Sequence, residues 1–136
     1  MPNSQQAYIN GAPNFESYTD NGDGTITDNV TSLMWQKTVP AATYAYADAV
    51  TYCATLTLGG YGGWRLPSFI ELVSIVDYEV SSPSINIIFP STPSAYFWSE
   101  TAVGGSTSKV WAVFFANGTN GTVDTSIGMD NVRCVR

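Results

Sequence analysis

The stretch TDNGDGTITDNV, residues 19–30, decides how the chain begins to fold, because it fits both a calcium-binding loop and the turn of a β-hairpin. An EF-hand-type loop needs oxygen ligands at its first, third, fifth and twelfth positions and glycine at its sixth. Aligning Asp23 and Gly24 with the fifth and sixth positions puts Thr19 at the first position and Val30 at the twelfth. Neither end residue is a carboxylate, so we predict a hairpin turn in which Asn-Gly and Asp-Gly supply left-handed backbone.

The composition narrows the class of protein. The 136 residues suit one domain, and 44% hydrophobic with 13% aromatic residues support a packed core. A net charge of −6 with only five Lys and Arg disfavours nucleic acid and polyanionic glycans as partners. Histidine is absent, which removes the commonest general base and zinc ligand. We therefore expect no metal site, no cofactor and no enzymatic activity.

Two segments carry the periodicity of helices. Residues 42–56 place apolar side chains on one helical face, which are Tyr46, Ala49, Val50, Cys53 and Leu56. In SFIELVSIVDY (68–78), Ser68 and Glu71 form the pattern of a capping box. The buried stripe expected there is Phe69, Leu72, Val73 and Val76. We attribute Glu71 to capping, and we expect Arg65 to bind backbone carbonyls or a carboxylate at the core margin.

Residues 96–136 show the pattern of strands and turns. The expected strands are YFWSET (96–101), KVWAVFF (109–115), TVDTS and NVRCVR (131–136), with NGTNG (117–121) as a turn. Together with the hairpin, two helices and a proline-rich loop, this order predicts an α+β fold. We expect the N-terminal hairpin to lie near the last strand. Alternation there separates Val132, Cys134 and Arg136 from Arg133 and Val135, and we expect both arginines to pair with acidic neighbours.

The two cysteines, Cys53 and Cys134, lie 81 residues apart. Two thiols are too few for a metal site, and the CxxC pattern of redox proteins is absent. The residues alone leave two possibilities, a disulfide bond or two buried thiols.

Five motifs in order resemble the Lcl C-terminal-domain-like family, a bacterial family of largely unknown function. They are DGTITDNVTSLMWQ, GYGGWRLPSFIELVSIVDY, FWSET, VWAVFF and the terminal VRCVR. The resemblance covers residues 15–136, which leaves residues 1–14 as an N-terminal extension of a single domain. It implies a C-type-lectin-like fold, with two helices beside antiparallel strands and an N-terminal β-hairpin. It also implies a disulfide between Cys53 and Cys134 and hence an oxidising location.

The resemblance implies adhesion or ligand binding at a cell surface, and for the namesake adhesin a trimer that binds sulfated glycans. This chain departs from that pattern through its acidic charge and its lack of the Glu-Pro-Asn and Trp-Asn-Asp motifs of calcium-dependent lectins. We therefore expect a calcium-independent, non-catalytic module that binds a neutral glycan or a protein surface, with a possible homo-oligomer. The alternatives are a structural subunit of a surface assembly and a diversified ligand-binding protein.

We expect an extracellular or cell-surface location. The start, MPNSQQAYINGAP, lacks the pattern of a signal peptide, so either a targeting segment has been removed or the chain is cytoplasmic. No apolar run is long enough to span a membrane. The formylglycine-generating enzymes share this general fold, but they need a reactive cysteine pair, and we expect both cysteines here to be bonded to each other.

The ligand face is expected within residues 96–131, where aromatic residues alternate with Asn, Ser, Thr and Gly. The candidate contact residues are Tyr96, Trp98, Asn117, Asn120, Asp124 and Asp130. The alternative is that these residues form ordinary turns and solvated strand edges. The tryptophans as a group are expected to be buried or half-buried, with Tyr96 and Trp98 as the best aromatic candidates.

Overall fold

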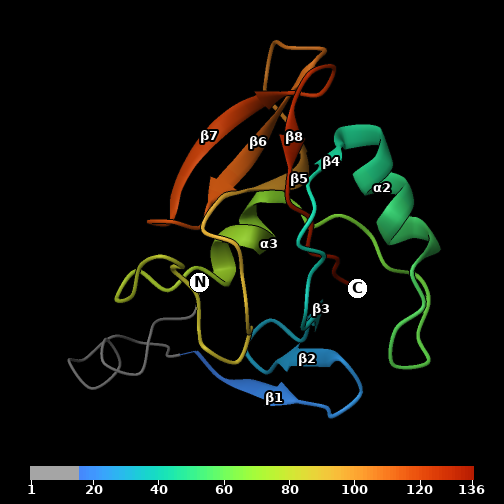
Figure 1. Ribbon diagram of the computed structural model, residues 1–136, viewed down its shortest axis with the longest axis vertical. Helices are drawn as coiled ribbons and strands as arrows, with labels where there is room; N and C mark the ends of the chain where they lie inside the picture. The colour runs from blue at the N-terminus through green and yellow to red at the C-terminus, as the bar shows by residue number, and fades with distance from the viewer. Residues whose placement is uncertain (1–15) are drawn as a thin grey trace.

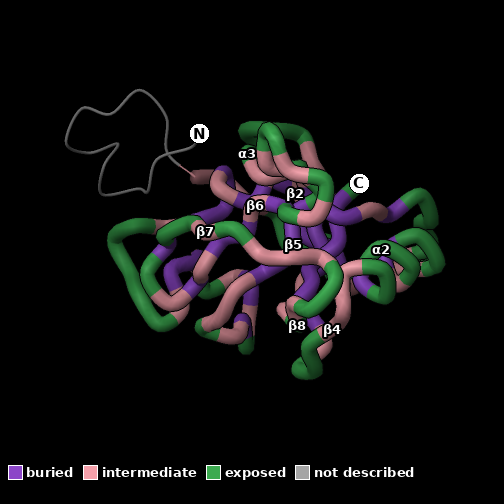
Figure 2. The backbone as a smooth tube through the Cα atoms, turned by 90° about the horizontal axis from the view of Figure 1, so that it is seen from above, coloured by how far each residue is buried: buried purple, intermediate pink, exposed green. Residues whose placement is uncertain are grey.

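A computed structural model of the protein describes residues 16–136, so the expected extension over residues 1–14 lies outside them. Three small antiparallel sheets and two helices surround the C-terminal segment of the chain (Figure 1). Figure 2 shows the buried backbone gathered at the centre of the molecule and the exposed backbone in the outer loops and on α2. The expected α+β class is confirmed.

The first sheet holds the hairpin that opens the fold. Its strands, in spatial order, are β1 (Tyr18–Asp20), β2 (Thr25–Asp28) and β3 (Met34–Gln36). The Asp20 carboxylate accepts a hydrogen bond from Gly22 N at 3.0 Å, and the Asp23 carboxylate accepts one from Thr25 N at 3.0 Å. These carboxylates therefore stabilise the turn, and the hairpin prediction is confirmed.

The helices are α2 (Tyr46–Thr55) and α3 (Phe69–Ser74). The capping box of Ser68 and Glu71 is present, and Arg65 binds the Glu71 carboxylate through two hydrogen bonds of 2.7 and 2.8 Å. Both predictions are confirmed. Helix α3 is shorter than predicted, because Val76 pairs with Ile85 in a β-bridge instead of continuing the helix. The prediction for Val50 was wrong: its side chain is 42% exposed, since only the narrower face around Cys53 meets the core.

The largest sheet has the order β5 (Tyr96–Ala102), β6 (Lys109–Phe114) and β7 (Thr119–Asp124). Strand β7 begins at Thr119, so the turn is shorter than the predicted 117–121. A second pair, β4 (Tyr44–Ala45) and β8 (Met129–Asp130), lies beside β5 (Figure 1).

The C-terminal segment joins these sheets. Asn131 pairs with Phe97 of β5, and Val135 pairs with both Trp35 of β3 and Arg65. The N-terminal hairpin therefore lies beside the last segment, as predicted. All of residues 131–135 are buried, because packing covers both sides of the segment, so the predicted two-faced alternation does not separate inside from outside.

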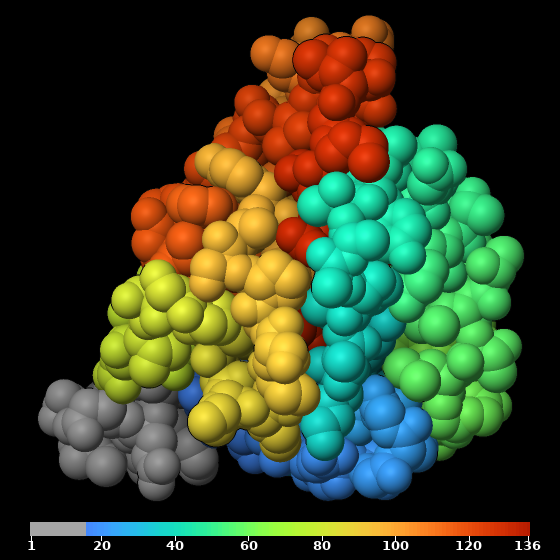
Figure 3. Space-filling model, viewed as in Figure 1, coloured from blue at the N-terminus to red at the C-terminus, as the bar shows by residue number. Residues whose placement is uncertain are grey.

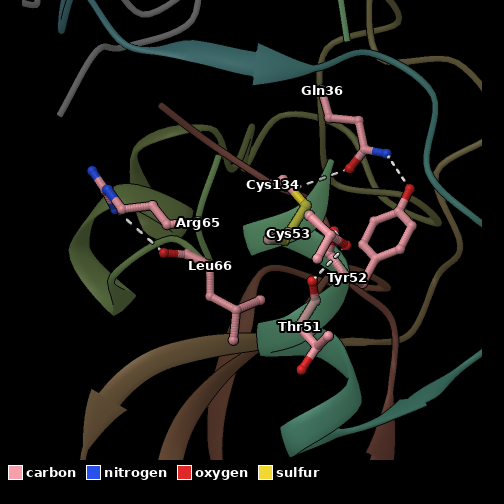
Figure 4. Close-up of a disulfide and its surroundings, with 8 residues drawn as sticks. Gln36, Thr51, Tyr52, Cys53, Arg65, Leu66 and Cys134 are labelled. Carbon is pink, nitrogen blue, oxygen red and sulfur yellow. Dashed lines mark hydrogen bonds between the residues drawn. A yellow bond between two sulfur atoms is a disulfide. The ribbon is translucent and has the colours of Figure 1, made fainter. Parts of the chain in front are cut away.

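A disulfide bond joins Cys53 of α2 to Cys134 of this segment, with the Cα atoms 5.5 Å apart and both side chains fully buried (Figure 4). The buried Gln36 amide lies beside the bond, where its Oε1 accepts a hydrogen bond from Cys134 N at 3.0 Å. Its Nε2 donates to the Tyr52 hydroxyl at 2.8 Å. The disulfide that the family resemblance implied is therefore present.

The buried guanidinium of Arg133 has no carboxylate partner among residues 16–136, so the expected acidic pairing was wrong. It donates to the backbone carbonyls of Gln36 and Lys37 and to the Thr92 hydroxyl. It also lies 4.8 Å from the ring centroid of Phe89. Burial lowers the pKa of Arg133 to about 9, which still leaves it charged at neutral pH.

Arg136 also binds a carbonyl rather than an acidic neighbour. Its guanidinium donates to Gly62 O at 2.6 Å and lies 4.7 Å from the ring centroid of Tyr61.

Candidate ligand-binding surfaces

The predicted contact residues are divided between two opposite faces of the β5–β6–β7 sheet. Successive side chains of a strand point to opposite faces, and residues paired across strands share one face. Tyr96 pairs with Phe114, whereas Asn120 pairs with Val113, the residue that precedes Phe114 in β6. The sheet therefore separates Tyr96 from Asn120, and the six residues do not form one ligand face.

Trp98 is fully buried and presents no surface to a ligand, so we correct its proposed role. Its indole nitrogen donates to Tyr44 O at 2.7 Å, and its ring packs edge-on against Tyr46. The segment at Gly128 covers it so closely that a Cβ there would lie 2.8 Å from Trp98 Cη2.

Asn117 and Asp124 use a side-chain oxygen to stabilise their own turns. Asn117 Oδ1 accepts hydrogen bonds from the Thr119 amide at 3.1 Å and hydroxyl at 2.7 Å. Asp124 Oδ1 accepts from the Ser126 amide at 2.8 Å and hydroxyl at 2.6 Å, and these bonds lower the pKa of Asp124. Both residues therefore fit the alternative interpretation, that of ordinary turn residues.

Trp111 is the aromatic residue that shares a face with Asn120. It pairs with Thr122, and Asn120 lies diagonally across from it on β7, within reach of a large side chain. Its ring lies 5.6 Å from that of Phe69, and Phe69 is held at the start of α3 by a hydrogen bond from its amide to Thr101 Oγ1. We call Phe69, Trp111, Asn120 and Thr122 the Trp111 patch.

The exposure of these side chains makes the Trp111 patch accessible. Trp111 and Phe69 are half-buried, whereas Asn120 and Thr122 are exposed. Among residues 16–136, no side chain forms a hydrogen bond with the side-chain amide of Asn120. As far as these residues are concerned, its two N–H donors and its carbonyl acceptor are free to bind a ligand. The Trp111 patch could have been predicted from the sequence. A hairpin turn at Asn117-Gly118 sets the register of β6 and β7 so that Trp111 pairs with Thr122.

The opposite face carries a row of four half-buried residues, Phe114, Tyr96, Asp130 and Tyr44, which we call the Asp130 row. The Tyr96 ring stacks on Phe114 with centroids 4.7 Å apart. It lies over Gly121, where a Cβ would come within 3.1 Å of the ring, so glycine leaves room for it.

Backbone hydrogen bonds of the neighbouring residue Asn131 place Asp130 in this row. Asn131 N donates to Tyr96 O and Trp98 N donates to Asn131 O, both at 3.0 Å, which sets Asp130 beside Tyr96. On its other side Asp130 pairs with Tyr44. Its Oδ2 is buried without a hydrogen-bond partner among the described residues, and burial raises the pKa of Asp130 to about 6.

A cavity of about 490 Å³ lies in the proline-rich segment between α3 and β5. Its walls are mainly apolar, and they are formed by Asp77, Val80, Pro83, Ile85, Asn86, Ile87, Phe89, Pro90, Ser91 and Thr92. At its edge the Glu16 carboxylate accepts a hydrogen bond from Asn86 at 3.0 Å. Burial raises the pKa of Glu16 to about 7.

These surfaces present aromatic rings together with hydrogen-bond donors and acceptors. Within residues 16–136, no group of three or more His, Cys, Asp and Glu side chains is arranged to hold a metal ion. The two cysteines are bonded to each other. Over the same residues, no helix has the length and apolar character needed to cross a membrane.

The structure is that of a disulfide-linked α+β domain with an accessible aromatic patch at Trp111 and a half-buried aromatic row on the opposite face of the sheet. A model of the Lcl C-terminal domain family matches residues 24–136, so the chain belongs to the Lcl C-terminal domain family. The resemblance of the five sequence motifs is thereby confirmed. A search of curated proteins found no match to the chain.

Proposed function

We propose that this domain is a non-catalytic, calcium-independent binding module that recognises a neutral glycan or a protein surface through the Trp111 patch. Trp35, Trp64 and Trp98 are at most 3% exposed, whereas Trp111 is half-buried beside the exposed Asn120 and Thr122. A rigid aromatic ring beside amide and hydroxyl groups supplies both contact area and adaptable hydrogen bonds.

Charge supports a ligand without anionic groups. The four residues of the patch are uncharged, and the net charge of −6 disfavours polyanions. Beyond Trp111, Lys109 and Asp124 pair opposite each other at the far end of the two strands. The patch therefore suits sugar hydroxyls or a neutral protein surface.

The disulfide supports a location outside the cell or on its surface, because such bonds persist mainly in oxidising compartments. The same bond links a helix to the final segment of the chain, which supports classing the fold as a variant of the C-type-lectin-like fold. A role in adhesion is part of the proposal, because a binding module at the cell surface could hold the cell to its ligand.

The test is a glycan and surface-protein array probed with wild type, Trp111→Ala and Asn120→Ala. We expect both substitutions to weaken binding by about tenfold or more and EDTA to leave it unchanged. The matched control is Tyr61→Ala, which removes an exposed aromatic ring elsewhere on the surface. Binding that survives both patch substitutions, or that needs calcium, would contradict the proposal.

A further inference from the structure

We propose that the cavity of the proline-rich segment is a second binding site, which takes a small organic amine with an apolar body. Its wall shares no residue with the Trp111 patch, so the two sites are separate. Three features favour such a ligand. They are the size and apolar lining of the cavity, the carboxylates at one part of its wall, and a buried guanidinium behind another part.

The cavity has the size and the lining of a small-molecule site. Its volume of about 490 Å³ falls within the range of roughly 300–1,000 Å³ that is usual for such sites, and its walls are mainly apolar. Two of its lining residues, Val80 and Ile87, are 46% and 93% exposed, so the cavity opens to solvent. In Figure 3 the yellow-green and gold parts of the proline-rich segment, which form the wall, lie next to each other on the surface. The apolar body of a ligand is therefore able to enter and to lose its contact with water.

Carboxylates gather at one part of the wall. Asp77 and Asn86 both line the cavity, and Asn86 Nδ2 donates to the Glu16 carboxylate at 3.0 Å. Burial raises the pKa of Glu16, and the nearby negative charges of Asp77 and Glu79 raise it further. A cation that approaches these groups relieves their mutual repulsion, so this part of the wall favours a ligand with a positive charge.

No lysine or arginine of the chain pairs with these carboxylates. Among residues 16–136, which include all five Lys and Arg, the ion pairs involve none of Glu16, Asp77 and Glu79. The net charge of −6 attracts cationic ligands over longer distances. Within the same range no group of three or more His, Cys, Asp and Glu side chains is arranged to hold a metal ion. An organic cation therefore fits the carboxylates and the apolar wall better than a metal ion does.

The buried guanidinium of Arg133 sets the orientation of the ligand. It donates to the Thr92 hydroxyl at 2.8 Å and lies 4.8 Å from the ring centroid of Phe89, and both of these residues line the cavity. Its positive charge repels a second cation from this part of the wall. We therefore expect the amine at Asp77 and Asn86, with the apolar body of the ligand toward Phe89.

The experiment titrates the full chain with phenethylamine at neutral pH and follows backbone amide signals by NMR. Two matched probes each lack one feature: 2-phenylethanol keeps the apolar body without the charge, and ethylamine keeps the charge without the ring. We expect phenethylamine to shift the amides of Asp77, Asn86 and Ile87, and to bind about tenfold more tightly than either matched probe. Equal binding of phenethylamine and either matched probe, or no shift of these amides, would overturn the proposal.

Two variants locate the amine. Asp77→Asn keeps an oxygen that accepts the hydrogen bond of the Glu79 amide, and Glu16→Gln keeps an acceptor for Asn86. Each removes one of the charges that repel each other, so we expect both to fold, to weaken phenethylamine several-fold and to leave 2-phenylethanol unchanged. The control is Asp48→Asn, which removes an exposed carboxylate on α2 and should leave the affinity as it is. An affinity that both cavity substitutions leave unchanged, or that Asp48→Asn lowers equally, would show that the amine binds elsewhere.

Discussion

The Oε1 atom of Gln36 accepts a hydrogen bond from the backbone amide of Cys134 at 3.0 Å, which ties the N-terminal sheet to the disulfide-bonded C-terminal segment. The same side chain donates to Tyr52 of α2, so three parts of the chain meet at one buried amide. Polar as well as apolar contacts therefore hold the N-terminal sheet, α2 and the C-terminal segment together.

Replacing Gln36 with Leu tests how much these two side-chain hydrogen bonds contribute to stability. The substitution leaves the buried Cys134 amide and the Tyr52 hydroxyl without their partner, so the free energy of unfolding should fall by about 2 kcal/mol. Urea denaturation measures it. The control is Asn120→Ala at the surface, for which we expect a change below about 0.5 kcal/mol. Equal effects of the two substitutions would contradict the structural role of Gln36.

The Cys53→Ser/Cys134→Ser double variant tests the disulfide. The bond closes a loop with a sequence separation of 81, so its loss should lower the free energy of unfolding by roughly 4–5 kcal/mol. Wild-type protein unfolded in the presence of a reductant should match the double variant. A reductant that leaves the wild-type denaturation midpoint unchanged would contradict this prediction.

Arg133→Met tests the buried guanidinium. Methionine fills much of the space but leaves the carbonyls of Gln36 and Lys37 without a donor, so we expect a loss of about 3 kcal/mol. Arg136→Met is the matched control, because Arg136 is exposed, and its loss should stay below about 1 kcal/mol. Thermal unfolding of the two variants side by side makes the comparison.

The pH dependence of stability follows from two half-buried carboxyl groups. Burial raises the pKa of Glu16 to about 7 and that of Asp130 to about 6, so the native state binds more protons than the unfolded chain between their ordinary values and these. Stability should therefore fall as the pH rises from 3.8 to about 6 for Asp130 and from 4.5 to about 7 for Glu16, by on the order of 1 kcal/mol for each group.

The Glu16→Gln/Asp130→Asn double variant should flatten this slope in urea denaturation across the same range. Glu71→Gln is a control at a carboxylate whose contribution to stability has the opposite pH dependence. Arg65 lowers the pKa of Glu71, so the stability that this carboxylate contributes is present above its ordinary pKa and is lost as the pH falls below it. A double variant with the wild-type slope would contradict the assignment.

The fold was predictable where the signal is local. The Asn-Gly and Asp-Gly turn and the capping box of Ser68 and Glu71 depend on residues close together in the chain, and both are present. The early end of α3 and the burial of residues 131–135 on both sides depend on distant partners. Periodicity within one segment contains no information about such partners.

The candidate site was predictable only in part for the same reason. The sequence indicated the region 96–131 but favoured Trp98 over Trp111. Strand alternation alone does not show that the segment at Gly128 covers Trp98. Hairpin register, by contrast, was available, and it places Asn120 on the face of Trp111 rather than on that of Tyr96.

The most direct test of the central claim uses the four tryptophan indole N–H signals in a proton–nitrogen NMR spectrum. A ligand identified on the array is titrated into the wild-type protein. Because Trp35, Trp64 and Trp98 are buried, we predict that the indole signal of Trp111 shifts with the ligand while the other three stay in place. Saturating ligand that leaves the Trp111 signal unmoved would contradict the claim that this residue forms the binding surface.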